Sequence, residues 1–123
     1  MVLASEAGLA GAYLYGSALR IRNNRDVDIA LLYGPSRRRP ADSRLEKIAS
    51  ALDKAFGKET DIHLVSELPD PVLFRVIREG ARLFAADRLA VVRFESETMI
   101  RFLDFKSSYD FLTERILMRS SHG

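Results

Sequence analysis

The stretch Asp26-Val-Asp-Ile-Ala-Leu-Leu-Tyr33 decides the fold predicted for this chain. Its apolar residues run almost unbroken from Val27 to Tyr33, which is typical of a central strand covered on both faces. The following Gly34-Pro35 is a turn signal that ends the strand. We therefore expect this segment in the middle of a small sheet with helices on either side.

Hydrophobic periodicity predicts the elements around this strand. Their order indicates an α/β (α+β) fold with a small mixed sheet flanked by helices. We expect a short helix over 3–9, strands over 12–15, 27–33 and 60–65, an edge strand over 82–84, and helices over 42–56, 70–80 and 87–119.

The ends of these helices also carry sequence signals. Asp42 or Ser43 is a suitable cap for the first long helix, and Gly57 is well placed to end it. Asp70, with a proline after it, is expected to cap the second. The last helix is long, so we expect a break near residues 106–108 and either one long helix or a helix pair.

Composition bounds the class of protein. The 123 residues are enough for one domain, and 47% apolar with 29% charged residues is ordinary globular composition. The chain has no cysteine, which excludes disulfides and thiolate metal sites. It has no apolar run long enough to span a membrane and no basic leader, so we expect a cytoplasmic protein. A net charge of +2 does not by itself argue for nucleic-acid binding.

Two carboxylates stand at the start of the central strand. Residues two apart on a strand point to one face, so Asp26 and Asp28 project together and repel each other. A divalent cation relieves that repulsion, and oxygen ligands favour Mg²⁺ or Mn²⁺ over zinc. The pair can equally be two strand-start carboxylates facing water.

Two further features give the acidic pair a context. Gly16-Ser17 ends the preceding strand, and a glycine there lets backbone N–H groups approach a phosphate, although it can also be an ordinary turn. Asp61 begins another apolar strand. If that strand lies beside the central one, three acids meet and can hold two metal ions for an in-line displacement.

These motifs, taken in order, resemble a known family. Tyr15-Gly-Ser17 followed by Asp26-Val-Asp28 is similar to the G-S-x(n)-D-x-D signature of the polymerase-β nucleotidyltransferase superfamily. More narrowly, the segments 61–84 and 93–104 resemble the minimal nucleotidyltransferases known as MNT or MntA-type antitoxins. The likeness covers about residues 12–105.

The resemblance implies a nucleotidyltransferase fold and a role for each matching residue. Gly16 and Ser17 would bind the triphosphate of ATP, while Asp26, Asp28 and Asp61 would hold Mg²⁺ and form the catalytic site. Asp61 would also help deprotonate the attacking hydroxyl. We add Arg20 and Arg25 as nucleotide-binding candidates. Arg20 flanks the phosphate site but can also be a solvated loop residue, whereas Arg25 precedes the first aspartate and can hold phosphate or simply balance charge.

The resemblance also implies a partner. Family members of this type neutralise a HEPN-domain toxin, in characterised cases by transferring AMP from ATP to a toxin tyrosine. The expected function is thus a protein adenylyltransferase that acts as an antitoxin. The loop from Ser17 to Asp26 is shorter than is usual in the family, which motivates an alternative: a catalytically vestigial antitoxin that neutralises its toxin by binding alone.

Three readings outside this signature stay open. His63 shares a face with Asp61, so it can line the pocket or be a hydrogen-bonded histidine beneath it. The run Arg37-Arg-Arg39 can be a solvated turn or a contact for a partner or RNA. A small RNA-binding domain is a third function, which would show steep salt dependence, but the near-neutral charge argues against it.

Overall fold

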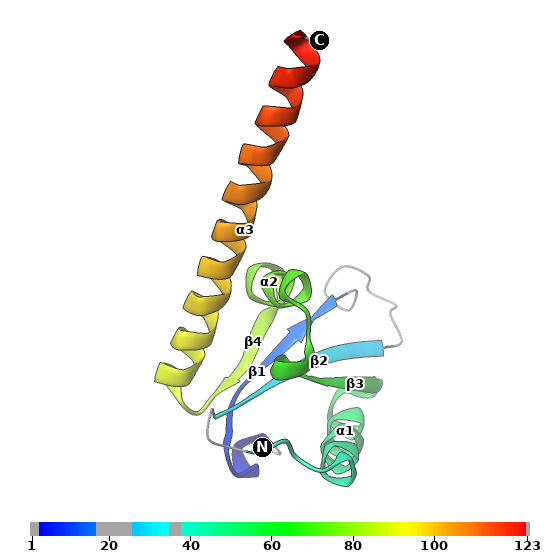
Figure 1. The fold of residues 1–123 in the computed structure, drawn as a ribbon. Helices are drawn as coiled ribbons and strands as arrows, with labels where there is room; N and C mark the ends of the chain where they lie inside the picture. Colours follow the sequence, from blue (N-terminus) through cyan, green and yellow to red (C-terminus); the bar gives the residue numbers. More distant parts are fainter. Residues whose placement is uncertain (1–2, 17–25, 35–37, 123) are drawn as a thin grey trace.

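In a computed structural model the chain forms a four-stranded sheet with helices against both faces (Figure 1). The structure describes residues 3–16, 26–34 and 38–122. The elements in chain order are η1 (Leu3–Ser5), β1 (Leu9–Tyr15), β2 (Asp26–Tyr33), α1 (Asp42–Phe56), β3 (Glu59–Leu64), η3 (Val65–Glu67), α2 (Asp70–Glu79), β4 (Ala81–Ala85) and α3 (Arg88–His122).

The sheet is mixed, as predicted, with the strand order β3-β2-β1-β4. Strand β2 is internal, pairing antiparallel with β1 and parallel with β3. Strand β4 pairs antiparallel with β1 and forms one edge, which confirms the expected edge strand. The parallel pairing of β2 and β3 is possible because α1 lies between them in the chain and returns it to the same end of the sheet.

Because the sheet is covered on both faces, it has two hydrophobic clusters. Alternate residues of β2 point to opposite faces, so this apolar strand contributes to both. The cluster beneath α1 has as buried members Leu3, Leu9, Ala12, Val27, Ile29, Leu31, Ile48, Leu52 and Leu64. The cluster beneath α2 and α3 has as buried members Tyr13, Ala30, Val65, Leu73, Val76 and Val91.

The helices begin and end near the predicted positions, but the predicted side-chain N-caps are absent from α1 and α2. Gly57 adopts the left-handed conformation, with φ 68°, and its N–H donates to the Asp53 carbonyl, so it ends α1 as expected. The expected side-chain caps are wrong. Ala41 and Pro69 occupy the N-cap positions of α1 and α2 without a capping hydrogen bond, so Asp42 and Asp70 are already the first helical residues.

Helix α3 is a single helix of 35 residues, and the expected break near residues 106–108 is wrong. At about 1.5 Å per residue it is roughly 52 Å long, and its C-terminal part extends away from the sheet (Figure 1). Apolar residues of α3 lie on more than one of its faces: Leu89, Val92 and Leu103 are exposed, whereas Val91 is buried together with Thr98.

A polar cluster joins the N-terminal half of α3 to the sheet. The Tyr13 hydroxyl on β1 donates to Glu95 Oε1 at 2.8 Å. Arg82 on β4 donates to both carboxylate oxygens of Glu95, at 2.7 and 2.8 Å.

Within the described residues, no helix is both long enough and apolar enough to cross a membrane.

Candidate functional site

Three neighbouring strands carry polar side chains at the same level of the sheet. Asp28 on β2 pairs in register with Tyr15 on β1 and with Asp61 on β3. Residues paired in this way point to the same face of a sheet, so the three side chains form a row across it. The parallel pairing of β2 with β3 therefore brings Asp28 and Asp61 together although they are distant in the sequence.

Gly16 lies against this row and leaves no room for a side chain. Its φ is 81°, a left-handed conformation that favours glycine. A β-carbon built on Gly16 would collide with Oδ2 of Asp28. The backbone at Gly16 thus lies directly beside the Asp28 carboxylate.

His63 completes a cluster of potential ligands with the two aspartates. Its Nε2 lies 3.1 Å from Asp61 Oδ2 and 4.0 Å from Asp28 Oδ1. One ligand atom from each of these three residues lies within 4.8 Å of the others. The imidazole therefore faces both carboxylates, with one ring nitrogen within hydrogen-bonding distance of Asp61.

Tyr15 is a member of the site that the sequence did not reveal. Burial and, to a smaller extent, the negative charges of Asp28 and Asp61 raise its pKa from the ordinary value of 10 to about 12. Its ring meets the His63 imidazole edge-on, with the ring centroids 6.2 Å apart. The position of Tyr15 at the end of a predicted strand does not indicate this role, because only the β1–β2 register shows that it stands opposite Asp28.

The predicted site residues fall into three groups. Gly16, Asp28 and Asp61 are brought together by the fold. Asp26 lies on β2, where its backbone pairs with Glu59, but its side chain is outside what the structure describes. Ser17, Arg20 and Arg25 lie outside the described residues altogether, so their roles stay predictions.

The donor set fits a hard divalent cation. Two adjacent carboxylates supply oxygen ligands of the kind that Mg²⁺ and Mn²⁺ take. Without a cation, their charges repel each other across neighbouring strands.

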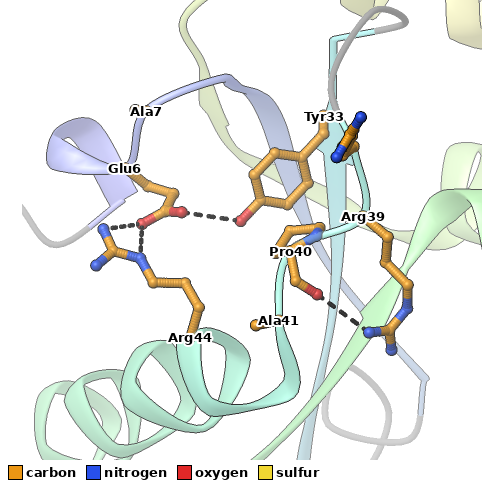
Figure 2. Close-up of a pocket in the computed structure, with 8 residues that line it drawn as sticks. Glu6, Ala7, Tyr33, Arg39, Pro40, Ala41 and Arg44 are labelled. Carbon is orange, nitrogen blue, oxygen red and sulfur yellow. Dashed lines mark hydrogen bonds and ion pairs between the residues drawn. The ribbon is translucent and has the colours of Figure 1, made fainter.

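A separate hollow of about 520 Å³ lies at the opposite end of β2, near Tyr33 (Figure 2). Glu6 provides a carboxylate in this hollow. The carboxylate accepts hydrogen bonds within the chain, from Arg44 Nε at 2.8 Å and from the Tyr33 hydroxyl at 3.3 Å. Arg39, at the rim, pairs with Asp42 at 2.9 Å and with Glu67. These internal pairs favour the solvated-turn reading of Arg39, while Arg37 lies outside the described residues.

With this geometry in place, comparison with known proteins defines the class. A family model described as polymerase beta nucleotidyltransferase matches residues 1–89, and the chain belongs to that family. A search of curated protein sequences found no match.

Solved structures share the fold at low sequence identity. A mutant of a toxin-antitoxin complex, MntA-HpeT, is 16% identical with a TM-score of 0.68, over 94% of this chain and 93% of that one. A toxin-antitoxin structure with AMP-PNP is 18% identical with a TM-score of 0.66, over the same shares. A third contains a tri-AMPylated Shewanella oneidensis HEPN toxin in complex with an MNT antitoxin. It is 17% identical with a TM-score of 0.62, over 91% of this chain and 86% of that one.

Proposed function

We propose that this chain, as one minimal nucleotidyltransferase domain, transfers AMP from ATP to a hydroxyl group of a HEPN-domain toxin and thereby acts as its antitoxin. The observation that carries the proposal is the pairing of Asp28 with Asp61 beside a glycine that leaves no room for a side chain. Membership of the nucleotidyltransferase family supports the reaction class. The AMPylated toxin held by a structure of the same fold supports the acceptor.

The proposed step is an in-line displacement at phosphorus. The acceptor hydroxyl oxygen forms a bond to the α-phosphorus of ATP while the bond from that phosphorus to the bridging oxygen breaks. Pyrophosphate leaves with the bonding electrons. Divalent ions, when bound, would neutralise the charge that builds up on the phosphate oxygens.

The residues of this chain position the reactants and move one proton. Asp28 and Asp61, with Asp26, would hold the metal ions, and Asp61 would accept the hydroxyl proton. The backbone at Gly16 and Ser17 would bind the triphosphate, while Arg20 and Arg25 would contact the nucleotide. Because little covalent chemistry is asked of the protein, most of the acceleration would come from positioning and charge neutralisation.

The test is mass spectrometry of the HEPN-domain protein that the resemblance implies is encoded beside this chain. After incubation with the chain, Mg²⁺ and each nucleoside triphosphate in turn, we expect the mass of one AMP at each modified site, with ATP as the donor. Asp28→Asn and Asp26→Asn should abolish the transfer. Glu46→Gln, which makes the same carboxylate-to-amide change at an exposed position on α1, should leave it intact.

The same experiment separates catalysis from binding. A toxin that is neutralised without gaining mass, equally well by Asp28→Asn, would show that the chain acts by binding alone. A toxin that gains mass and is neutralised only by chains with intact aspartates would exclude that alternative.

A further inference from the structure

We propose that His63 is a metal ligand alongside Asp28 and Asp61, and that it makes this site favour first-row transition ions such as Mn²⁺ over Mg²⁺. The inference rests on the proposed function, because it concerns the metal site of the same reaction. It adds a nitrogen ligand to a site that the aspartates alone would make entirely of oxygen.

The distances suit ligands of one metal ion. Bonds of about 2.1 Å place neighbouring ligand atoms of an octahedral ion about 3.0 Å apart and opposite ones about 4.2 Å apart. His63 Nε2 lies 3.1 Å from an oxygen of Asp61 and 4.0 Å from an oxygen of Asp28. One ligand atom from each residue lies within 4.8 Å of the others, so a single ion can contact all three once the side chains adjust.

The strand geometry explains why the imidazole reaches this position. Asp61 and His63 are two residues apart on β3, so both point to the same face of the sheet. Next to His63 in the register is Ala30, whose small side chain leaves space for the imidazole. The Tyr15 ring on β1, beyond β2, meets the imidazole edge-on from the same side of β3.

The location of His63 at the edge of the sheet keeps its Nε2 atom accessible to an ion. Strand β3 is an edge strand, and the His63 side chain is 36% exposed. The site is therefore open to solvent on one side, from which an ion and a nucleotide can enter.

The ligand chemistry sets the metal preference. Mg²⁺ binds almost entirely through oxygen and loses its waters reluctantly, whereas imidazole nitrogen is a good ligand for transition ions. Replacing His63 should therefore weaken Mn²⁺ binding much more than Mg²⁺ binding. We expect the ratio of Mn²⁺ to Mg²⁺ affinity to fall about tenfold in His63→Gln, the scale typical of a lost metal-site contact.

The decisive experiment detects the nitrogen itself. Pulsed electron paramagnetic resonance of bound Mn²⁺ should show coupling to ¹⁵N in protein labelled with ¹⁵N-histidine. The measurement is made on the full chain, alone and with AMP-PNP, and the isotope separates protein nitrogen from nucleotide nitrogen. The chain has two histidines, so His122→Gln is a matched control for His63→Gln.

The outcomes separate this inference from the proposed function. Coupling that persists in His122→Gln and disappears in His63→Gln, together with the lowered affinity ratio, supports His63 as a ligand. Bound Mn²⁺ without histidine coupling overturns the inference. If Mn²⁺ binding and transfer are still lost in Asp28→Asn, that result leaves the proposed function standing. Binding and transfer that are both unaffected by Asp28→Asn would instead overturn the proposed function.

Discussion

Gly16 lies so close to Asp28 that a β-carbon on the glycine would collide with the aspartate carboxylate. The turn and the acidic strand therefore constrain each other directly. A side chain at position 16 has to displace the carboxylate or move the turn, and either change disturbs the place where phosphate and metal are expected to meet.

We expect Gly16→Ala to destabilise the chain more than Gly57→Ala. Both glycines have positive φ, so both substitutions strain the backbone by about 1 kcal/mol. A β-carbon at Gly57 meets nothing within 4 Å, whereas one at Gly16 also meets Asp28. Urea unfolding of the two variants measures the difference.

A double variant tests whether Asp28 causes the excess. Adding Asp28→Ala to Gly16→Ala should recover part of the lost free energy of unfolding, because the colliding carboxylate is gone. Adding it to Gly57→Ala should change the free energy of unfolding only as much as Asp28→Ala changes that of the wild type. Equal additivity in both backgrounds would show that the two residues are not coupled.

The charge of Asp28 should be measurable at Tyr15. Burial is the larger cause of the raised pKa of Tyr15, and the charges of Asp28 and Asp61 add to it. We expect Asp28→Asn to lower this pKa from about 12 while leaving it above the ordinary value of 10. Ultraviolet titration of tyrosinate measures the change in a Tyr13→Phe background, which removes a second tyrosine whose pKa burial raises. Glu46→Gln should leave the titration unchanged.

The raised pKa of Tyr15 also predicts how stability changes in alkali. Above pH 10 an unfolded tyrosine loses its proton, whereas Tyr15 in the folded chain keeps its proton to about pH 12. Deprotonation then favours the unfolded state, so the free energy of unfolding should fall as the pH rises through this window. Below pH 10 both states are protonated and Tyr15 contributes no pH dependence.

Chemical denaturation of the wild type and Tyr15→Phe at increasing pH measures that contribution. We expect a shallower decline in Tyr15→Phe, because the titrating hydroxyl is absent while the ring remains. Tyr13, whose pKa burial also raises, is present in both proteins and contributes equally. Parallel declines would contradict the prediction.

Leucines at different depths provide a test of the packing. Leu31 on β2 is 1% exposed and Leu89 on α3 is 68% exposed. We expect Leu31→Ala to cost about 2–5 kcal/mol, because it leaves a cavity in the core. Leu89→Ala should change stability by no more than about 0.5 kcal/mol. Thermal or denaturant unfolding compares the same substitution in the two environments.

The central strand and the aspartate pairing could be predicted because local chemistry specifies them. The apolar run of β2 demanded cover on both faces, and the helix that follows it made parallel pairing with β3 a natural consequence. Asp61 could then be placed beside Asp28 from its position at the start of the next strand. The role of Tyr15 needed the antiparallel register of β1 with β2, which residue types alone do not determine.

The buried face of α3 could not be predicted for a related reason. Periodicity shows that apolar residues share a helix face, but α3 carries apolar residues on two faces. Val91 packs on the sheet, whereas Leu103 is exposed. Which of these faces is buried depends on tertiary contacts, such as the ion pair of Glu95 with Arg82. The sequence of the helix alone does not specify these contacts.

The contact between Glu95 and Tyr13 predicts a coupling between α3 and the sheet. Tyr13 is 2% exposed and its hydroxyl donates to Glu95. Glu95→Leu leaves that buried hydroxyl without its acceptor and also removes the ion pair with Arg82, so we expect a loss of about 1–3 kcal/mol. In a Tyr13→Phe background the same substitution should cost less, because no hydroxyl is left unpaired. A double-mutant cycle by denaturant unfolding measures the difference, and strict additivity would show that the hydroxyl does not help to hold α3.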